Sequence, residues 1–255
     1  MRIGICTGTD NLEYLKSLGF DYVEANLSKL ANMSDEEFEA VCAELDRTQM
    51  PIESVNLFCG AETRLSCGID PDAIKAYAER ALARAARVGV ETVVIGSCKA
   101  RKIPEGYTFE EAKESFCRAL EVISDVAVSF GIKIAIEPLS DDNFIKTLAD
   151  GAAICEEVGR ENVGCIVDLF HFYKNGEDMA DIAKYGKYIL HTHIARMNDD
   201  RGTPSAEDEG DVRAFLSTLE GIGYCGRMSL ECSYLPDFET AIKNYVDLLG
   251  SMGVM

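Results

Sequence analysis

Residues 130–138 read FGIKIAIEP and carry the unit from which the fold can be inferred. Phe130 and Gly131 place a glycine just past the predicted end of a helix, where a left-handed backbone conformation stops the helix. Residues 132–137, IKIAIE, have the length and the β-branched content of a strand, with apolar residues at 132 and 134–136. The stretch ends in Glu137 and Pro138, so it predicts a helix end, a strand and then a loop that opens with a carboxylate.

The same phrase, an apolar residue followed by glycine, recurs before five predicted strands. It reads LGF at 18–20, VGV at 88–90, FGI at 130–132, VGR at 158–160 and IGY at 222–224. Short apolar runs alternate with longer segments of helical period, which is the pattern of β-α-β units and a parallel sheet. The predicted strands are residues 2–6, 21–25, 52–57, 91–96, 132–137, 163–168, 188–194 and 226–231.

Eight strand-and-helix units in 255 residues predict an α/β protein with a single (β/α)8 TIM barrel. No shift of composition marks a linker, so residues 1–255 are expected to form one domain. The alternative is an open doubly wound sheet, which usually carries a Gly-x-Gly-x-x-Gly phosphate turn after its first strand. Residues 4–11, GICTGTDN, do not match that turn, so the barrel is favoured.

The composition is that of an ordinary globular protein and narrows the class of partner. Hydrophobic residues make up 47%, charged residues 27%, and the net charge is −19, which argues against nucleic-acid binding. No run approaches the roughly 20 apolar residues of a membrane span, and the opening MRIGICTGTD lacks the apolar segment of a signal peptide. The ten cysteines include no Cys-x-x-Cys pair and are expected to be reduced thiols in a cytoplasmic protein.

Four successive predicted strands end in residue types that bind metal ions: Glu137, Asp168, His193 and Glu231. Singly, each has an ordinary explanation, since a strand-end carboxylate can cap the next helix and a histidine can be hydrogen-bonded in a core. Closure of a barrel directs all four toward one point on the face where barrel enzymes place their active sites. Oxygen ligands with one imidazole suit Mn²⁺, Co²⁺ or Mg²⁺, and also admit Zn²⁺, but do not form a thiolate-rich zinc site.

The chain contains three histidines, and two of them lie in YILHTHIA at residues 188–195. Because side chains alternate along a strand, His191 and His193 face the barrel interior and Thr192 faces the helices. We expect His193 to lie at the barrel mouth as a metal ligand. His191 is then expected one layer below, as a supporting or core residue.

Together these motifs resemble those of a known family. IEP with Glu137, VDLFH with Asp168 and His171, HTH with His193 and SLE with Glu231, in that order on the last four strands, are similar to the motifs of the xylose-isomerase-like TIM barrels. The chain most resembles the sugar and sugar-phosphate isomerases and epimerases of that family, including the ketose 3-epimerases. Residues 15–25 and 201–226 also resemble the family's first β-α unit and the segment before its last strand.

The resemblance implies a metal-dependent isomerase or epimerase of a small ketose, a keto-sugar derivative or a sugar phosphate. Glu137, Asp168, His193 and Glu231 would hold one divalent metal ion. Glu137 and Glu231 would act as acid and base through a metal-stabilised cis-enediolate. The resemblance also implies a homo-oligomer, either a dimer or a tetramer, whose partner is a small carbohydrate and not a membrane.

Substrate contacts are implied as well: His171 and Arg201 would hydrogen-bond substrate oxygens. In ketose 3-epimerases a second substrate-binding glutamate follows the glutamate of the fifth strand by six residues. Here that position is Asn143, which we expect to bind substrate in its place.

A second departure from the ketose 3-epimerases concerns an arginine. The family places it six residues after the metal-binding histidine, but that position is Asp199 here. Arg201 lies two residues further on, with Arg196 as a rival. The two departures argue against a specific assignment as a tagatose or psicose epimerase and leave the metal site unaffected.

Other functions use related scaffolds. A metal-dependent lyase that dehydrates a keto-inositol or dehydroshikimate-like compound would form the same enolate but expel a hydroxyl group. A non-catalytic sugar-binding barrel would keep the pocket without turnover. A phosphodiesterase of the apurinic-endonuclease branch would need further histidines for a multi-zinc cluster, and its substrate would meet a net charge of −19.

Long segments at residues 57–70 and 97–108 follow the third and fourth predicted strands and are candidate lids over the substrate, with plain surface excursions as the alternative. The second segment contains Lys99, Arg101 and Lys102, a basic patch in an acidic chain. We expect Lys99 to bind a phosphate or carboxylate group of the substrate.

Overall fold

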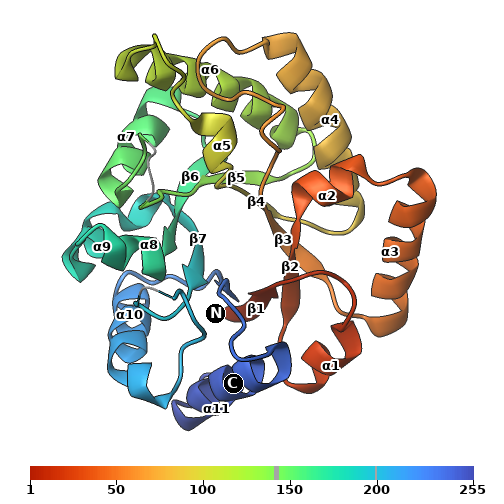
Figure 1. The fold of residues 1–255 in the computed structure, drawn as a ribbon, viewed down its shortest axis with the longest axis vertical. Helices are drawn as coiled ribbons and strands as arrows, with labels where there is room; N and C mark the ends of the chain where they lie inside the picture. Colours follow the sequence, from red (N-terminus) through yellow and green to blue (C-terminus); the bar gives the residue numbers. More distant parts are fainter. Residues whose placement is uncertain (141–143, 199) are drawn as a thin grey trace.

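The computed structural model describes residues 1–140, 144–198 and 200–255. Within these ranges eight parallel strands pair in sequence order, and β8 pairs with β1, so the sheet closes into a barrel (Figure 1). Every predicted strand is found within one residue of its expected bounds, and the (β/α)8 barrel is confirmed. The strands are β1 (Arg2–Cys6), β2 (Tyr22–Asn26), β3 (Ile52–Asn56), β4 (Thr92–Ile95), β5 (Lys133–Ile136), β6 (Val163–Asp168), β7 (Ile189–Ile194) and β8 (Arg227–Leu230).

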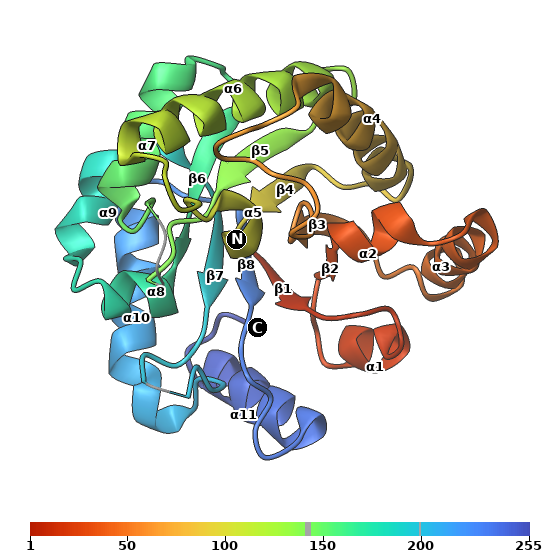
Figure 2. The same cartoon turned by 45° about the horizontal axis from the view of Figure 1, so that its top comes forward.

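The helices surround the strands on the outside of the barrel, as Figures 1 and 2 show from two directions. None of the helices described here is long and apolar enough to cross a membrane. Their bounds are α1 (Leu12–Ser17), α2 (Leu27–Asn32), α3 (Asp35–Thr48), α4 (Pro71–Arg87), α5 (Cys98–Arg101), α6 (Phe109–Val128), α7 (Leu148–Val158), α8 (Leu169–Lys174), α9 (Met179–Tyr185), α10 (Glu209–Gly221) and α11 (Phe238–Ser251), with 3-10 turns η1 (Gly186–Tyr188) and η2 (Ala206–Asp208).

Local sequence signals set the ends of these helices. At the start of α3 the Ser34 hydroxyl accepts a hydrogen bond from the Glu37 amide, and the Glu37 carboxylate accepts one from the Ser34 amide. This reciprocal pair satisfies two amides that a helix leaves unpaired. The repeated glycine phrase acts at the opposite ends: its five glycines, at 19, 89, 131, 159 and 223, have φ angles between +60° and +96°. Other residues rarely adopt such angles, so the phrase stops helices as predicted.

The barrel interior is divided into an apolar and a polar part. Val94, Ala135 and Ile166, from β4 to β6, form a small buried cluster apart from the large core between strands and helices. The strands β2, β3, β7 and β8 instead bury polar side chains, namely Glu24, Ser54, His191, His193 and Ser229. Burying polar groups lowers stability unless they are hydrogen-bonded, so this part of the interior is where a functional site is to be sought.

Candidate functional site

The four residues predicted at the strand ends lie together at the barrel mouth. Glu137 directly follows β5, Asp168 ends β6, His193 is the fifth residue of β7, and Glu231 directly follows β8. The Nδ1 atom of His193 lies 3.3 Å from an oxygen of Glu231, 3.6 Å from one of Glu137 and 3.9 Å from one of Asp168. One ligand atom from each of the four residues lies within 4.8 Å of the others, so together they could hold a metal ion.

The imidazole of His193 fits a metal ligand in its hydrogen bonding. Its Nε2 atom is 2.9 Å from a carboxylate oxygen of Glu24, whereas Nδ1 is buried and has no hydrogen-bond partner among the described residues. A proton on Nε2 leaves the lone pair of Nδ1 free, and this lone pair lies among three carboxylates. The Nδ1 atom of His191 is also buried and unpaired within the described chain, but among the described residues His191 belongs to neither group of candidate metal ligands.

The electrostatics of the cluster favour a positive charge at Nδ1 of His193. Burial lowers the pKa of this imidazole, but the negative charges of Glu24 and Glu231 outweigh burial and hold the pKa well above its usual range. Burial raises the pKa of Glu137, and the charge of Glu231 raises it further. Burial acts in the same direction on Glu231, yet His193 and Arg201 outweigh it and lower that pKa to about 2. The carboxylates that would retain a proton on Nδ1 would equally stabilise a metal cation there.

Arg201 lies against the same cluster. Its guanidinium donates a hydrogen bond to Asp168 over 2.5 Å and another to Glu231, and it packs over the ring of Phe170. The backbone of Arg201 has a φ angle of +48°, and its carbonyl accepts a hydrogen bond from the backbone amide of Ser233. The rival Arg196 instead donates to Asp208 and to a serine of the same loop. Of the two arginines, the structure brings Arg201 to the cluster.

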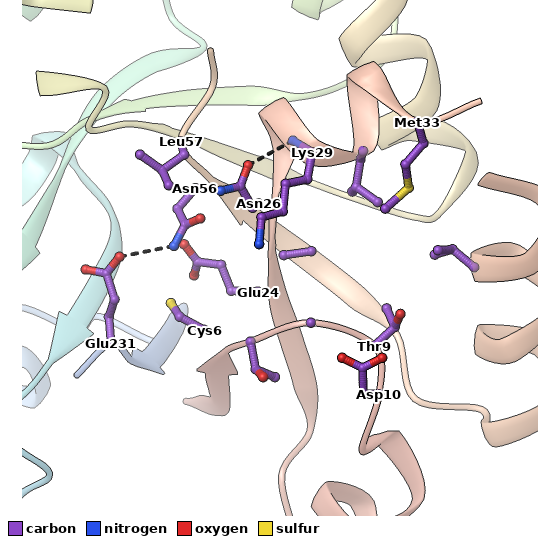
Figure 3. Close-up of a pocket in the computed structure, with 15 residues that line it drawn as sticks. Cys6, Thr9, Asp10, Glu24, Asn26, Lys29, Met33, Asn56, Leu57 and Glu231 are labelled. Carbon is purple, nitrogen blue, oxygen red and sulfur yellow. Dashed lines mark hydrogen bonds between the residues drawn. The ribbon is translucent and has the colours of Figure 1, made fainter. Parts of the chain in front are cut away.

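A cavity of about 470 Å³ adjoins the cluster on the side of β1, β2 and β3. Glu231 and Glu24 line its inner end, and Asn56 donates a hydrogen bond to the Glu231 carboxylate over 3.1 Å (Figure 3). Farther out, Asn26 and Lys29 border it from the start of α2, and Figure 3 shows the side chain of Lys29 reaching into this space. The cavity gives a small polar molecule access to Glu231.

Comparison with known proteins agrees with this architecture. The family model described as xylose isomerase-like TIM barrel matches residues 12–250. The chain belongs to this family. A curated relative, the inosose isomerase of Bacillus licheniformis, is 34% identical over 133 residues, which cover 48% of this chain and 48% of the relative. This xylose isomerase-like chain thus spans about half the length of the curated relatives it matches.

Two solved structures share the fold of this xylose isomerase-like barrel. D-Psicose 3-epimerase, in a structure determined in the presence of D-fructose, superposes with a TM-score of 0.84 at 20% identity over 98% of both chains. The IOLI protein, in a structure with a bound zinc atom, superposes with a TM-score of 0.73 at 22% identity over 100% of this chain and 97% of the other. At these identities the likeness shows a shared barrel.

The predicted substrate-binding residues have different outcomes. His171 lies in α8, one turn beyond Asp168, and is buried; its Nδ1 accepts a hydrogen bond from the amide of Ser140 over 3.1 Å. Asn143 lies outside the described residues. Lys99 is exposed on α5 and is not among the residues that line the cavity. Substrate binding by these three residues stays a prediction.

The prediction of a basic surface patch at residues 99–102 is wrong for one residue, Arg101. Arg101, at the end of the short helix α5, is fully buried. One of its terminal nitrogens donates to the backbone carbonyl of Glu137 over 2.8 Å, and its guanidinium packs over the ring of Phe116. Burial lowers the pKa of Arg101 to about 10. Arg101 therefore supports the loop that carries Glu137 and offers no surface charge.

The sequence did not predict Gly96 and Glu24 at the cluster, nor Asn26, Lys29 and Asn56 at the cavity. Gly96, which directly follows β4, leaves room for Glu137, because a Cβ atom at this position would lie 1.7 Å from a carboxylate oxygen of Glu137. Glu24, in β2, is the residue that Nε2 of His193 contacts. Its signal was visible in DYVEA at residues 21–25, where a carboxylate interrupts an apolar strand, but it lies before the strand end.

Proposed function

We propose that this protein is a metal-dependent isomerase or epimerase of a small ketose, a keto-sugar derivative or a sugar phosphate. The observation that carries the proposal is the convergence of Glu137, Asp168, His193 and Glu231 around one buried imidazole nitrogen, beside a cavity that Glu231 also lines. The curated inosose isomerase supports the same class of reaction.

The four side chains would hold one divalent ion through three carboxylate oxygens and Nδ1 of His193. These donors favour Mn²⁺, Co²⁺ or Mg²⁺, and the zinc atom in the IOLI structure makes Zn²⁺ a further candidate. When bound, such an ion would polarise a substrate carbonyl and would stabilise the negative charge that develops as a proton leaves the neighbouring carbon.

Two features support Glu231 as the group that accepts the first proton. Its carboxylate lines the cavity and its side chain is 22% exposed, whereas the side chain of Glu137 is 7% exposed. Asn56 and Arg201 each hold one oxygen of Glu231, so the carboxylate has a fixed orientation. We assign to Glu231 the removal of a proton from the carbon beside the substrate carbonyl. Glu137 then returns a proton to the substrate or moves one between its oxygens.

The cavity supports a hydroxyl-rich substrate. The amide groups of Asn26 and Asn56 border it, and such groups both donate to and accept from hydroxyls. Its volume of about 470 Å³ lies in the range of small-molecule pockets. Lys29 places one positive charge toward its outer part, so we assign to Lys29 the far end of the substrate, whether hydroxyl or acidic.

The remaining expectations are part of the same proposal. We propose that residues 1–255 form one domain, that the protein assembles as a dimer or tetramer, and that it acts in the cytoplasm on a free carbohydrate. Size-exclusion chromatography with light scattering of the full chain measures the oligomeric state.

The test is to incubate the Mn²⁺-loaded protein with a panel of ketoses, inososes and keto-acids in deuterated water. An isomerase or epimerase incorporates deuterium at the carbon beside the carbonyl and releases a product of unchanged composition. A product that has lost water identifies the lyase instead, and absence of both exchange and product with every compound supports the non-catalytic barrel. In the same assay Glu231→Gln is expected to lose exchange, and Glu207→Gln, which alters an 89% exposed side chain on η2, is its matched control.

A further inference from the structure

Glu24 is a carboxylate enclosed in the barrel interior. Its side chain is 0% exposed, and it comes from the middle of β2, away from the strand ends. Four donors from three other strands surround it. One carboxylate oxygen, Oε2, accepts hydrogen bonds from Ser54 and Ser229 over 2.6 Å each and from Nε2 of His191 over 2.7 Å. The other, Oε1, accepts from Nε2 of His193 over 2.9 Å.

The two oxygens of Glu24 have different partners, and this difference distinguishes Glu24 from a carboxylate that only holds strands together. Oε2 carries the three contacts that tie β3, β7 and β8 together, and Tyr22 extends this network through a 2.7 Å hydrogen bond to Ser229. The hydrogen bond at Oε1 goes to the imidazole whose other nitrogen faces Glu137, Asp168 and Glu231. A carboxylate that accepts from Nε2 keeps a proton there and fixes the plane of the ring.

We infer that Glu24 is a positioning residue, which holds a proton on Nε2 of His193 and thereby presents Nδ1 to a divalent cation. The inference rests on the metal site of the proposed function and adds a requirement from a strand that contributes none of the four ligands. Its physical basis is general: a histidine that binds a metal through one nitrogen gains basicity and a fixed orientation from an acceptor at the other.

A competing arrangement is available in the same place. Cys6, Glu24 and His193 form a second group whose ligand atoms lie within 4.8 Å of one another, so Glu24 could be a ligand itself. The contacts favour the positioning role, because both oxygens of Glu24 are already engaged by hydrogen-bond donors. The two arrangements also differ in which nitrogen of His193 meets the metal.

The first measurement is nitrogen-15 NMR of the full-length protein with labelled histidine, metal-free and loaded with Zn²⁺. His193 is expected to show a slowly exchanging proton on Nε2 in both states, and Zn²⁺ is expected to shift the Nδ1 resonance. A Zn²⁺-loaded protein without a proton on Nε2 of His193, or with the metal on Nε2, overturns the inference and favours Glu24 as a ligand. Variants of His171 and His191 assign the signals.

The second measurement is the affinity for Mn²⁺ by calorimetry. Glu24→Gln is expected to weaken binding by about 10–100-fold, the usual effect of losing the partner of a metal-binding histidine. Glu24→Asp keeps the charge but is one methylene too short to reach Nε2, and is expected to weaken binding as well. Ser54→Ala removes a contact at Oε2 and leaves the one at Oε1, so its affinity should stay within about threefold of wild type.

The outcomes separate this inference from the proposed function. A folded Glu24→Gln or Glu24→Asp protein with wild-type Mn²⁺ affinity overturns the inference, even if the wild type turns over a sugar. Weakened Mn²⁺ binding in these variants, together with no turnover by the wild type, supports the inference and refutes the isomerase. If Glu24→Gln does not fold, Glu24→Asp and the wild-type resonances decide.

Discussion

The two halves of the barrel mouth differ in charge and in openness. The half formed by β5 to β8 gathers three carboxylates and an imidazole in a closed cluster. The half formed by β1 to β3 holds a cavity of about 470 Å³ bordered by two asparagines, a lysine and Asp10. Glu231 borders both. The difference teaches that, under the proposed function, the proton transfers and the recognition of substrate fall to separate strands, so each is expected to be alterable while the other is kept.

The largest expected effect is at the boundary of the two halves. Glu231→Gln keeps the size of the side chain but cannot accept a proton, so kcat at saturating metal should fall by about 10²–10⁴-fold. The rate of substrate deuterium exchange gives the same readout without a coupled assay. A Glu231→Gln protein that retains more than a tenth of wild-type exchange, while Glu207→Gln behaves as wild type, would assign the proton transfer elsewhere.

A substitution on the closed half should act through the metal ligands. In Gly96→Ala the added Cβ occupies the position of a Glu137 oxygen, so the carboxylate must move. We expect Mn²⁺ affinity to fall by about 10-fold or more and kcat to fall with it. Gly210→Ala is the matched control, because a Cβ at this position on α10 meets no atom within 4 Å. Equal Mn²⁺ affinities for the two variants, measured by calorimetry, would contradict the crowding argument.

A substitution on the open half should act on binding. Lys29→Met removes the positive charge in the cavity and should raise KM by about 10-fold, as expected for one charge-assisted hydrogen bond, with kcat and metal affinity little changed. Lys99→Met, on exposed α5, is the comparison. If KM rises for Lys99→Met and stays constant for Lys29→Met, the substrate lies toward α5 and the division of the mouth is wrong.

The smallest expected effect concerns stability and lies outside both halves. Burial raises the pKa of Glu177, which accepts a hydrogen bond from the first amide of α7, to about 7. The folded chain therefore holds this proton more tightly than the unfolded chain, whose carboxyl titrates near 4.5. The resulting stability is complete below pH 4.5 and is lost as the pH rises through about 7.

Glu177→Gln removes this pH dependence. The difference in Tm, variant minus wild type, should therefore increase from pH 4.5 to pH 8 by an amount on the order of 1–2 °C. Thermal unfolding followed by circular dichroism at several pH values measures the difference. A constant difference across this range would show that Glu177 has an ordinary pKa, and the pH dependence of stability would then have to be sought at the mouth itself.

The candidate ligands could be predicted from the sequence because their signal is local. A strand ends where an apolar run ends, parallel strands of a barrel end at one face, and so Glu137, Asp168, His193 and Glu231 had to approach one another. Glu24 could not be recognised in this way. It lies before the end of its strand, and its partners His191 and His193 are 167 and 169 residues away in the sequence.

The charge of Arg101 and the small size of Gly96 also could not be interpreted correctly from the sequence. Arg101 lies between Lys99 and Lys102 in the sequence and is expected at the surface. In the structure it is buried and donates a hydrogen bond to the backbone carbonyl of Glu137. From the sequence, Gly96 is an ordinary glycine at the end of a strand. Only the structure shows that the carboxylate of Glu137 fills the space where a Cβ atom would lie. In both residues the deciding contact is made by β5 or the residue after it, which no local pattern around 96–101 specifies.

By itself, the sequence determined the eight-stranded barrel, the helix ends at the repeated glycine phrase and the residues that point into the mouth, because each depends on a backbone period or on the positive φ angle that glycine adopts. Only the tertiary structure decided which further side chains meet the four predicted ligands there. It paired His193 with Glu24, placed Arg201 on Asp168 and Glu231, and opened the cavity beside β1 to β3. These contacts join residues far apart in the chain, and they are fixed by how the closed barrel and its helices pack.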